Sequence, residues 1–380
     1  MKKNDNSKPA LALHKKLKGK IRVVPAAPVR NRKDLALVYT PGVAAVSSLV
    51  AKEPHLAREY TGKGRMIAVI SDGSAVLGLG NIGALGALPV MEGKCALFKT
   101  FADVDAIPLV LDTQDPEKII ETILRIAPAF GGINLEDISA PKCFEIEQRI
   151  IDELNIPVMH DDQHGTAVVV LAALMNALKV VGKKMAGAKV VISGAGAAGF
   201  AVAKLLHASG VQDIVVLDSK GIIVEGRSDL TRHKIELATF TNPRSLTGGL
   251  RDALTGADVL IGVSGPGLAT AADIKLMNKK AIVFALANPT PEIMPDEAKK
   301  GGAAVIGTGR SDFPNQINNS LAFPGIFRGA LDNKVAKITE KHKVAAAKAI
   351  AGLVPKPTAN KIVPDMFDKR VAKAVARVIR

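Results

Sequence analysis

The chain has 380 residues, of which 48% are apolar, so it is long enough for two domains that each bury a core. No run approaches the roughly 18 consecutive apolar residues of a membrane span, and the N-terminus shows no secretory signal. Cys95 and Cys143 are the only cysteines, which argues against a disulfide framework. We expect a soluble, cytoplasmic protein without a membrane partner.

The net charge of +15 resides at the two ends of the chain. Residues 1–33 carry a net charge of +10 and residues 334–380 carry +9, which leaves −4 for the stretch between them. The chain also has no Trp and only two Tyr on which nucleic-acid bases could stack. Basic surfaces at both ends therefore explain the charge better than nucleic-acid binding, which remains a remote alternative.

Apolar runs alternate with amphipathic patterns along the first part of the chain. This alternation is typical of an α/β protein with mostly parallel sheets. Strand-like runs occur at residues 65–71, 95–101, 106–112, 130–138 and 156–160, and helical patterns occur at residues 116–128 and 143–154.

A long apolar helix is predicted at residues 167–181, ended by Gly182. We expect it to join an N-terminal α/β substrate and metal domain (residues 1–165) to a Rossmann-type, doubly wound NAD(P)-binding domain (residues 166–329). Two basic amphipathic helices are predicted within residues 330–380, and they can pack back on either domain, so that they can rejoin the N-terminal one.

A nucleotide-binding turn is predicted where a β-branched strand meets an amphipathic helix. In such a turn the first glycine allows the tight bend, the second lets the backbone approach the pyrophosphate, and the third lets helix and strand pack. The turn consists of Gly194, Ala195, Gly196, Ala197, Ala198 and Gly199.

The choice between NAD and NADP stays open in the sequence. Asp218 ends the next predicted strand 19 residues after Gly199, and its carboxylate can accept both ribose hydroxyls, as NAD requires. Lys220 lies two residues further on and can instead meet the 2′-phosphate of NADP.

A second glycine motif, formed by Gly78, Gly80 and Gly83, lacks this context. No clear strand adjoins it, and no acidic residue ends a following strand at the right offset. We therefore expect this motif to allow close packing beside an active site and not to bind a nucleotide.

Two pairs of acidic residues follow strand-like runs. Glu136 and Asp137 end one run, and Asp161 and Asp162 end another. Ligands bind at the carboxyl ends of parallel strands, and Mg²⁺ or Mn²⁺ prefers oxygen ligands. The alternative is that these carboxylates cap the helices that follow, but two pairs at strand ends favour a metal site.

Several other side chains are candidates for acid–base chemistry or substrate binding. Tyr39 is one of two tyrosines, and a phenol can serve as a general acid. Lys94 lies in an apolar run, where burial is expected to lower the pKa of an ammonium group towards that of a useful base. Asn288 and Asn319 can bind a nicotinamide ribose or a carboxylate, although each also suits a turn.

Seven segments between residues 39 and 330 occur in a characteristic order. They are YTPGVA, LGLGNIG, NLED, HDDQHGTA, GAGAAG, ANPTPEI and GRSDFPNQINNSLAFPGIFRGAL. With these segments the chain resembles the malic enzyme family in its compact bacterial and archaeal form. The resemblance is specific because the segments are several, long and correctly ordered.

The resemblance implies oxidative decarboxylation of malate to pyruvate and CO₂ by a homodimer that uses NAD or NADP and Mg²⁺ or Mn²⁺. It implies that Lys94 binds the substrate and takes its hydroxyl proton, and that Tyr39 protonates the enolate. The implied metal ligands are Glu136, Asp137 and Asp162, and the implied contacts to substrate and nicotinamide are Asn288 and Asn319.

The resemblance leaves two questions open. Larger malic enzymes carry a carboxylate-binding arginine where this chain has Ala75, so Lys99, from the same or a neighbouring subunit, is a candidate replacement. The product is also open, because a malolactic enzyme, which converts malate to lactate, remains the alternative.

Overall fold

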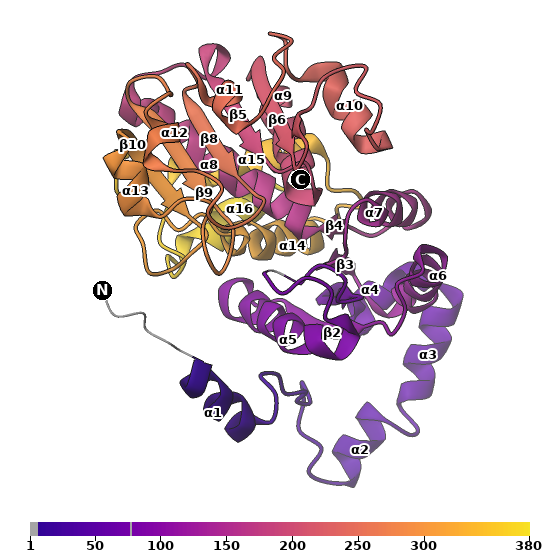
Figure 1. Cartoon of the computed structure of the whole chain (residues 1–380). Helices are drawn as coiled ribbons and strands as arrows, with labels where there is room; N and C mark the ends of the chain where they lie inside the picture. Colours follow the sequence, from indigo (N-terminus) through magenta and orange to yellow (C-terminus); the bar gives the residue numbers. More distant parts are fainter. Residues whose placement is uncertain (1–6, 77) are drawn as a thin grey trace.

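Two sheets, each surrounded by helices, form the body of the molecule (Figure 1). The computed structural model describes residues 7–76 and 78–380. The first sheet has the strand order β2-β1-β3-β4, and the second has the order β10-β9-β8-β5-β6-β7. The α/β class predicted from the alternating apolar runs is confirmed.

The first sheet brings three strand ends to one edge. Ile70 pairs with Leu135, and Leu135 pairs with His160, so the residues that follow β1, β3 and β4 lie side by side. All four strands are parallel: β1 (Met66–Ser71), β2 (Asp105–Val110), β3 (Gly132–Leu135) and β4 (Val158–His160). The connecting helices are α5 (Gly83–Ala102), α6 (Pro116–Ile126) and α7 (Lys142–Glu153).

The strand-like run at residues 95–101 is helical, which corrects the prediction. It forms the last two turns of α5, where Met91, Cys95, Phe98 and Ala102 are buried. These residues recur every three or four positions, which is the period of a helix face. A short apolar run does not show this period by itself, and the longer α5 does.

Helix α8 (Asp161–Val181) is the long apolar helix predicted from the sequence. It begins directly after β4, and fifteen of its residues are buried. Gly182 ends it with a φ of 72°, the left-handed conformation of a glycine C-cap. The two acidic residues predicted at a strand end, Asp161 and Asp162, are therefore the first two residues of this helix.

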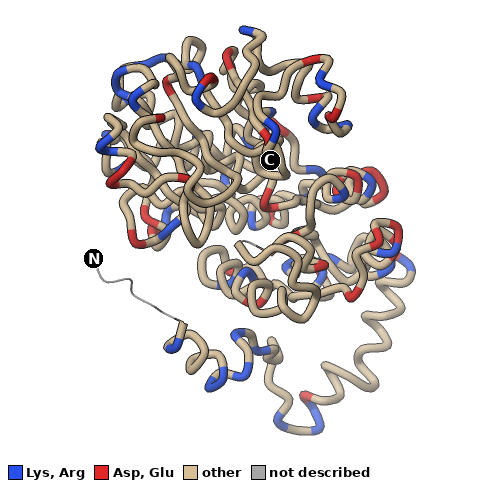
Figure 2. Tube along the Cα trace, in the orientation of Figure 1, with Lys and Arg blue, Asp and Glu red and all other residues tan. Residues whose placement is uncertain are grey.

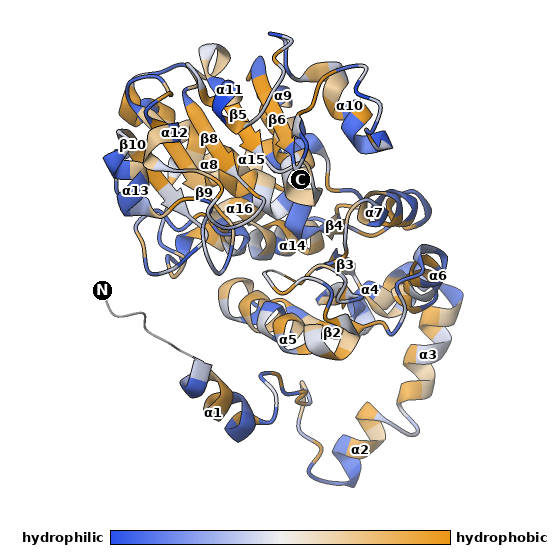
Figure 3. Cartoon of the chain, in the orientation of Figure 1, coloured by the Kyte–Doolittle hydropathy of each residue, from blue (hydrophilic) through white to orange (hydrophobic). Residues whose placement is uncertain are grey.

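The second sheet is doubly wound around β5, with strongly apolar strands (Figure 3). Its parallel strands are β5 (Lys189–Ser193), β6 (Asp213–Asp218), β8 (Val259–Gly262), β9 (Ala281–Ala285) and β10 (Ala303–Thr308), and β7 (Gly221–Ile222) runs antiparallel to β6. Its helices are α9 (Ala197–Ala208), α10 (Arg232–Phe240), α11 (Leu250–Leu254), α12 (Ala271–Ile274) and α13 (Pro295–Lys300). This topology confirms the Rossmann-type prediction.

The C-terminal helices pack on both halves of the chain. These helices are α14 (Phe323–Asp332), α15 (Glu340–Gly352) and α16 (Arg370–Val378). The ring of Phe323 lies 4.6 Å from that of Phe98 on α5, and the buried Asn176 of α8 donates to the carbonyls of Ala351 and Ile362, each at 2.9 Å. The predicted domain boundary at residue 165 stays a prediction, because α8 is shared by both halves.

The N-terminal helices form an arm that extends from the body (Figure 1). Helices α1 (Ser7–Leu17), α2 (Arg32–Val38) and α3 (Val43–Lys52) bury no residue, and Leu37 is 70% exposed. Many of the Lys and Arg residues of the basic N-terminal segment lie along this arm (Figure 2). Short helices lead from the arm to β1 or lie between larger elements: η1 (Pro54–Leu56), α4 (Ala57–Tyr60), η2 (Gly62–Gly64), η3 (Ala127–Ala129) and η4 (Met185–Gly187).

Candidate active site

A buried ammonium group between two carboxylates lies at the carboxyl edge of the first sheet. Lys94 of α5 places its Nζ 2.8 Å from Glu136 Oε1 and 2.7 Å from Asp161 Oδ2. The ring of Phe323 lies 4.3 Å from the same Nζ. Glu136 follows β3 directly and Asp161 follows β4, so the register of the sheet sets the spacing of the two carboxylates.

The pKa of Lys94 is raised, contrary to the expectation that burial lowers it. Burial alone acts strongly in the expected direction, but the charges of Asp161 and Glu136 outweigh it. The side chain is therefore a stable ammonium ion in this arrangement. The sequence places Lys94 in an apolar run, but it does not reveal that two carboxylates from distant strands meet it there.

Three carboxylates gather beside this ion pair. Glu136, Asp137 and Asp162 each offer an oxygen, and these atoms all lie within 4.8 Å of one another. Asp162 Oδ2 accepts a hydrogen bond from the backbone N–H of Asp137 at 2.8 Å. Burial and the charge of Asp162 raise the pKa of Glu136 despite the opposing effect of Lys94. A cluster of this kind fits a divalent cation, which would offset the repulsion among its members.

The side chains of Asp161 and Asp162 do not act as caps of helix α8. Asp161 binds Lys94 and Asp162 binds the N–H of Asp137, so both carboxylates are directed towards other elements. His160, the N-cap of α8, makes no side-chain cap hydrogen bond. The negative charges still lie favourably at the start of α8.

Asp161 is a site residue that the sequence analysis did not assign. Burial raises its pKa to about 6, although Lys94 acts in the opposite direction. Gly165 leaves room for it, because a Cβ on that glycine would lie 1.8 Å from Asp161 Oδ1 and 3.1 Å from Asn319 Cβ. The same contact places Asn319, the first residue of η5 (Asn319–Leu321), against the first turns of α8, and its contact with substrate stays a prediction.

A second buried carboxylate holds the start of α8. Glu147 of α7 accepts the backbone N–H of His160 at 2.7 Å. Its Oε2 also accepts a hydrogen bond from Gln163 Nε2 at 3.1 Å and forms a hydrogen bond with His164 Nε2 at 3.0 Å. Lys343 of α15 completes the network, with its Nζ 2.9 Å from His164 Nδ1. This network links α7, α8 and a C-terminal helix directly behind the acidic cluster.

The predicted nucleotide turn has the geometry that its three glycines require. Only three residues separate β5 from α9, and Gly194 has a φ of 121°. A Cβ on Gly196 would face open space, whereas one on Gly199 would lie 1.8 Å from the Gly194 carbonyl oxygen. The turn therefore opens at its second glycine and packs closely at its third. It lines a cavity of about 800 Å³, which we call the dinucleotide cavity.

Asp218 forms one wall of the dinucleotide cavity and is surrounded by cationic groups. Its Oδ2 accepts from the Arg227 guanidinium and from Lys234 Nζ, the latter at 2.6 Å. Burial raises the pKa of Asp218, but the hydrogen bonds from Arg227 and Lys234 outweigh burial and hold that pKa well below its usual value.

The first glycine motif makes close contacts between loops. Eleven residues separate β1 from α5, so this segment is not a short strand-to-helix turn. A Cβ on Gly78 would lie 2.4 Å from the carbonyl oxygen of Asn288. Gly78 therefore packs against the loop after β9, beside Asn288, whereas a Cβ on Gly80 or Gly83 would face open space. Leu77, part of the quoted LGLGNIG segment, lies outside the described residues.

Two family models match the chain. The model described as "Malic enzyme, N-terminal domain" matches residues 18–118 and 113–151, and that described as "Malic enzyme, NAD binding domain" matches residues 163–379. The chain belongs to the malic enzyme family. The glycine turn and the dinucleotide cavity accordingly belong to an NAD(P)-binding domain of an oxidoreductase.

Curated malic enzymes resemble the chain over almost its whole length. It is 56% identical to a bifunctional malic/malolactic enzyme of Bacillus subtilis, over 97% of this chain and 91% of that protein. It is 54% identical to an NAD-dependent malic enzyme of Geobacillus stearothermophilus, over 95% of this chain and 76% of that protein, and 50% identical to an NADP-dependent malic enzyme of Halomonas elongata, over 95% and 85%.

Solved structures agree with this family. The NAD-dependent malic enzyme of Thermotoga maritima matches with a TM-score of 0.95 and 50% identity, over 97% of this chain and 98% of that one. Malic enzyme from Pyrococcus horikoshii matches with a TM-score of 0.91 and 48% identity, over 97% and 89%.

Two of the predicted malic enzyme residues are not brought to Lys94 within this single chain. Tyr39, the C-cap of α2 on the arm, is 65% exposed. Lys99 is exposed and forms ion pairs with Asp103 at 2.6 Å and Asp105 at 2.9 Å. Ala75, by contrast, is at the site, because its N–H donates to the Asp137 carbonyl at 3.0 Å.

Replacing Glu147 with glutamine should destabilise the fold in a pH-dependent manner. Burial raises the pKa of Glu147, but His164, Lys343 and His160 together lower it to about 2. A carboxylate whose folded pKa is depressed stabilises the protein above its unfolded pKa of about 4.5, and this contribution is lost as pH falls towards 2. We expect Glu147→Gln to cost about 3 kcal/mol at pH 7.

Urea unfolding of wild type and Glu147→Gln across this pH range measures the effect. The difference in unfolding free energy should be larger above about pH 5 than near pH 2, because the stabilising contribution is lost as Glu147 takes up a proton. Glu145→Gln is the matched control, because Glu145 lies exposed on the same helix and should change stability by less than about 0.5 kcal/mol. Equal stability of Glu147→Gln and wild type at pH 7 would contradict this account of the network.

Proposed function

We propose that this chain oxidises malate and decarboxylates it to pyruvate and CO₂ while it reduces NAD(P)⁺. The observation that carries the proposal is the buried Lys94 ion pair beside three carboxylates next to the dinucleotide cavity. Ala140 and Pro141 line that cavity and follow Asp137 by three and four residues, so the two sites adjoin. The cofactor supplies the hydride acceptor.

We propose Glu136, Asp137 and Asp162 as ligands of Mg²⁺ or Mn²⁺. Their oxygens are close enough for one ion, and three carboxylates leave about half of an octahedron for substrate and water. A divalent ion held there would supply a Lewis acid able to polarise an oxygen of the substrate.

Lys94 is proposed to take the hydroxyl proton of malate, which requires that it is neutral when malate binds. The charges of Asp161, Glu136 and Asp162 raise its pKa, and a divalent ion among these carboxylates would weaken that effect. Asn319 lies against the first turns of α8, and Asn288 lies beside the first glycine motif. We propose that these two amides orient substrate and nicotinamide.

Tyr39 is proposed to reach the site from the arm of a second copy in a homodimer. The arm exposes Leu37 and Val38 beside Tyr39, and none of residues 32–52 is buried in this chain. This stretch and α8 are long and apolar enough for a membrane span by length and composition alone, but α8 is mostly buried in the body. Pairing of two arms would cover the exposed apolar surface, and we keep the cytoplasm as the expected location.

Product analysis decides between the malic and malolactic reactions. With malate, NAD(P)⁺ and Mn²⁺, we expect reduced nicotinamide to accumulate in step with pyruvate. The malolactic alternative deserves a direct test because the Bacillus subtilis relative is described as bifunctional. Lactate formed without net reduced cofactor would exclude the proposed reaction.

Replacement of Asp162 by asparagine should weaken metal binding. Removal of one charged ligand should lower the affinity for Mn²⁺ by at least about tenfold, because even partners of metal ligands typically contribute that much. Titration of free Mn²⁺ by electron paramagnetic resonance measures this without turnover. Asp152→Asn, on the exposed surface of α7, is the control, and equal affinity in all three proteins would show that Asp162 is no ligand.

Hybrid dimers test whether Tyr39 acts on the partner's Lys94. Lys94→Ala and Tyr39→Phe should each lower malate turnover by about 10² to 10⁴-fold, which is typical of a lost acid or base. If the site is shared, a hybrid of the two variants contains one intact pair. Random mixing should then restore about a quarter of wild-type activity.

Absence of any recovery in co-expressed hybrids would place both residues in the same chain. Deuterium exchange at the methyl group of pyruvate tests the role of Tyr39 as general acid separately. This exchange should be lost in Tyr39→Phe. It should persist weakly in Lys94→Ala. Exchange at the wild-type rate in Tyr39→Phe would show that the phenol is not the proton donor.

A further inference from the structure

A buried carboxylate joins the two loops that leave β8 and β9. Glu292, in the segment ANPTPEI, is only 2% exposed. Its Oε1 accepts the backbone N–H of Ser264 at 2.9 Å, and its Oε2 accepts that of Ala287 at 3.0 Å. Ser264 lies two residues after the end of β8, and Ala287 lies two residues after the end of β9. One side chain therefore ties the two loops together where they leave the sheet.

The end of β8 makes room for this carboxylate. Gly262 is the last residue of β8, and a Cβ there would lie 2.4 Å from Glu292 Cδ. Burial raises the pKa of Glu292, and the backbone N–H groups of Ser264 and Ala287 oppose burial by their hydrogen bonds to the carboxylate. A buried carboxylate is costly unless it is hydrogen-bonded. The place of Glu292 between the loops therefore depends on both N–H groups.

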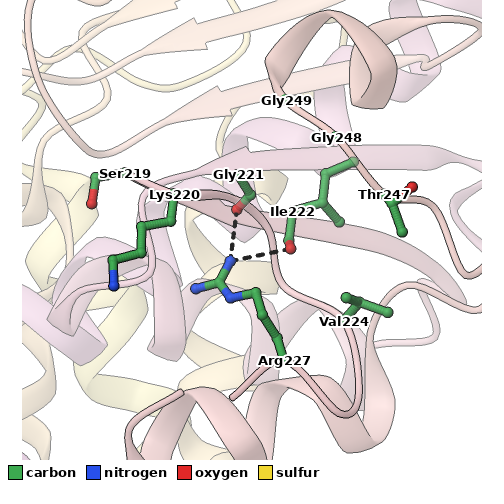
Figure 4. Close-up of a pocket in the computed structure, with 9 residues that line it drawn as sticks. All are labelled: Ser219, Lys220, Gly221, Ile222, Val224, Arg227, Thr247, Gly248 and Gly249. Atoms are coloured by element: carbon green, nitrogen blue, oxygen red, sulfur yellow. Dashed lines mark hydrogen bonds between the residues drawn. The ribbon is translucent and has the colours of Figure 1, made fainter. Parts of the chain in front are cut away.

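The two loops lie on the β8 side of the dinucleotide cavity. Strand β5 lies between β8 and β6, so the glycine turn is in the middle, and Ser264 and Leu268 line the cavity beyond it. On the β6 side the cavity adjoins a smaller pocket of about 450 Å³. There Arg227 donates to the carbonyls of Gly221 and Ile222, at 3.3 and 3.2 Å (Figure 4). The cavity thus has two distinct ends.

The nicotinamide half of the cofactor belongs at the β8 end. In a fold of this kind the acidic residue after the second strand, here Asp218, faces the adenosine ribose, and the pyrophosphate lies at the glycine turn. The other half of the dinucleotide then extends towards β8 and β9. In the loop after β9, Asn288 lies against Gly78 of the first glycine motif. That motif follows β1, whose carboxyl end borders the Lys94 site, so this end faces the reacting groups.

We propose that Glu292 is a positioning residue for the nicotinamide end of the cofactor. Through Ser264 it fixes one wall of the dinucleotide cavity. Through Ala287 it fixes the start of the loop that carries Asn288. Only the contribution of Asn288 to malate turnover rests on the proposed function, because the coupling of the two loops concerns the NAD(P)-binding domain itself.

Glu292→Gln tests the proposal because it keeps the shape of the side chain and changes its hydrogen bonding. A carboxylate only accepts, whereas the NH₂ group of an amide would face one of the two backbone N–H donors. In calorimetric titrations of the full chain, the affinities for NADH and NADPH should fall at least about tenfold, which is typical of a lost hydrogen bond to a charged group. The affinity for ADP-ribose, which lacks the nicotinamide, should stay within about twofold.

Asp296→Asn is the matched control, because Asp296 lies exposed on the neighbouring α13 and should alter none of these affinities. Glu292→Asp keeps the charge but is one methylene shorter, so it cannot reach both loops. It should show the same selective loss, and it carries the test if the glutamine variant does not fold. Equal loss of affinity for NADH and ADP-ribose would overturn the proposal. Reduced stability with unchanged affinities would overturn it as well.

A double variant tests whether Glu292 acts through Asn288. Glu292→Gln and Asn288→Ala should each lower malate turnover, and their combined loss should be less than the product of the two single losses, because the residues act as a unit. Full multiplication of the two losses would exclude this route. Selective loss of NADH binding in a protein that does not turn over malate would leave the inference standing and refute the proposed function instead.

Discussion

The buried ammonium of Lys94 is held where carboxylates from two strand ends converge. Glu136 and Asp161 contact it at 2.8 and 2.7 Å, and Asp137 and Asp162 complete a group of four carboxylates around one lysine. Three of these carboxylates, those of Glu136, Asp161 and Asp162, act on the single charge of Lys94, and this imbalance is costly for the buried carboxylates without a further cation. The metal proposal, the choice of base and the need for a firm scaffold all follow from this imbalance.

The scaffold around this group is built from buried contacts that tolerate little displacement. Parallel strands β3 and β4 place Glu136 and Asp161 on adjacent residues of one edge, and α8 begins at that edge. Glu147, His164 and Lys343 hold the start of α8 from behind. The C-terminal helices thus support the site, although they are almost two hundred residues from it in sequence.

Much of the fold could be predicted from local patterns. Helix α8 with its glycine cap and the glycine turn at Gly194 depend on neighbouring residues alone. The sequence also identifies the acidic residues as candidates for the site, because they follow apolar runs. The prediction of a strand at residues 95–101 is wrong, because the helical period of its apolar residues appears only over the full length of α5.

What the sequence could not supply were contacts between distant segments. The direction of the Lys94 pKa depends on Asp161, 67 residues away, and the state of Asp218 depends on Arg227 and Lys234, which no motif marks. The motif identifies Tyr39 as a candidate, but it does not predict that Tyr39 is exposed. The exposure follows from the arm, whose helices bury no residue within one chain.

The account depends most on whether the carboxylate group binds one divalent ion next to Lys94. A crystal of the protein grown with Mn²⁺ and measured for anomalous scattering tests this directly. We predict one strong anomalous peak bonded to oxygens of Glu136, Asp137 and Asp162. A crystal saturated with Mn²⁺ that shows no peak among these three side chains would contradict the account.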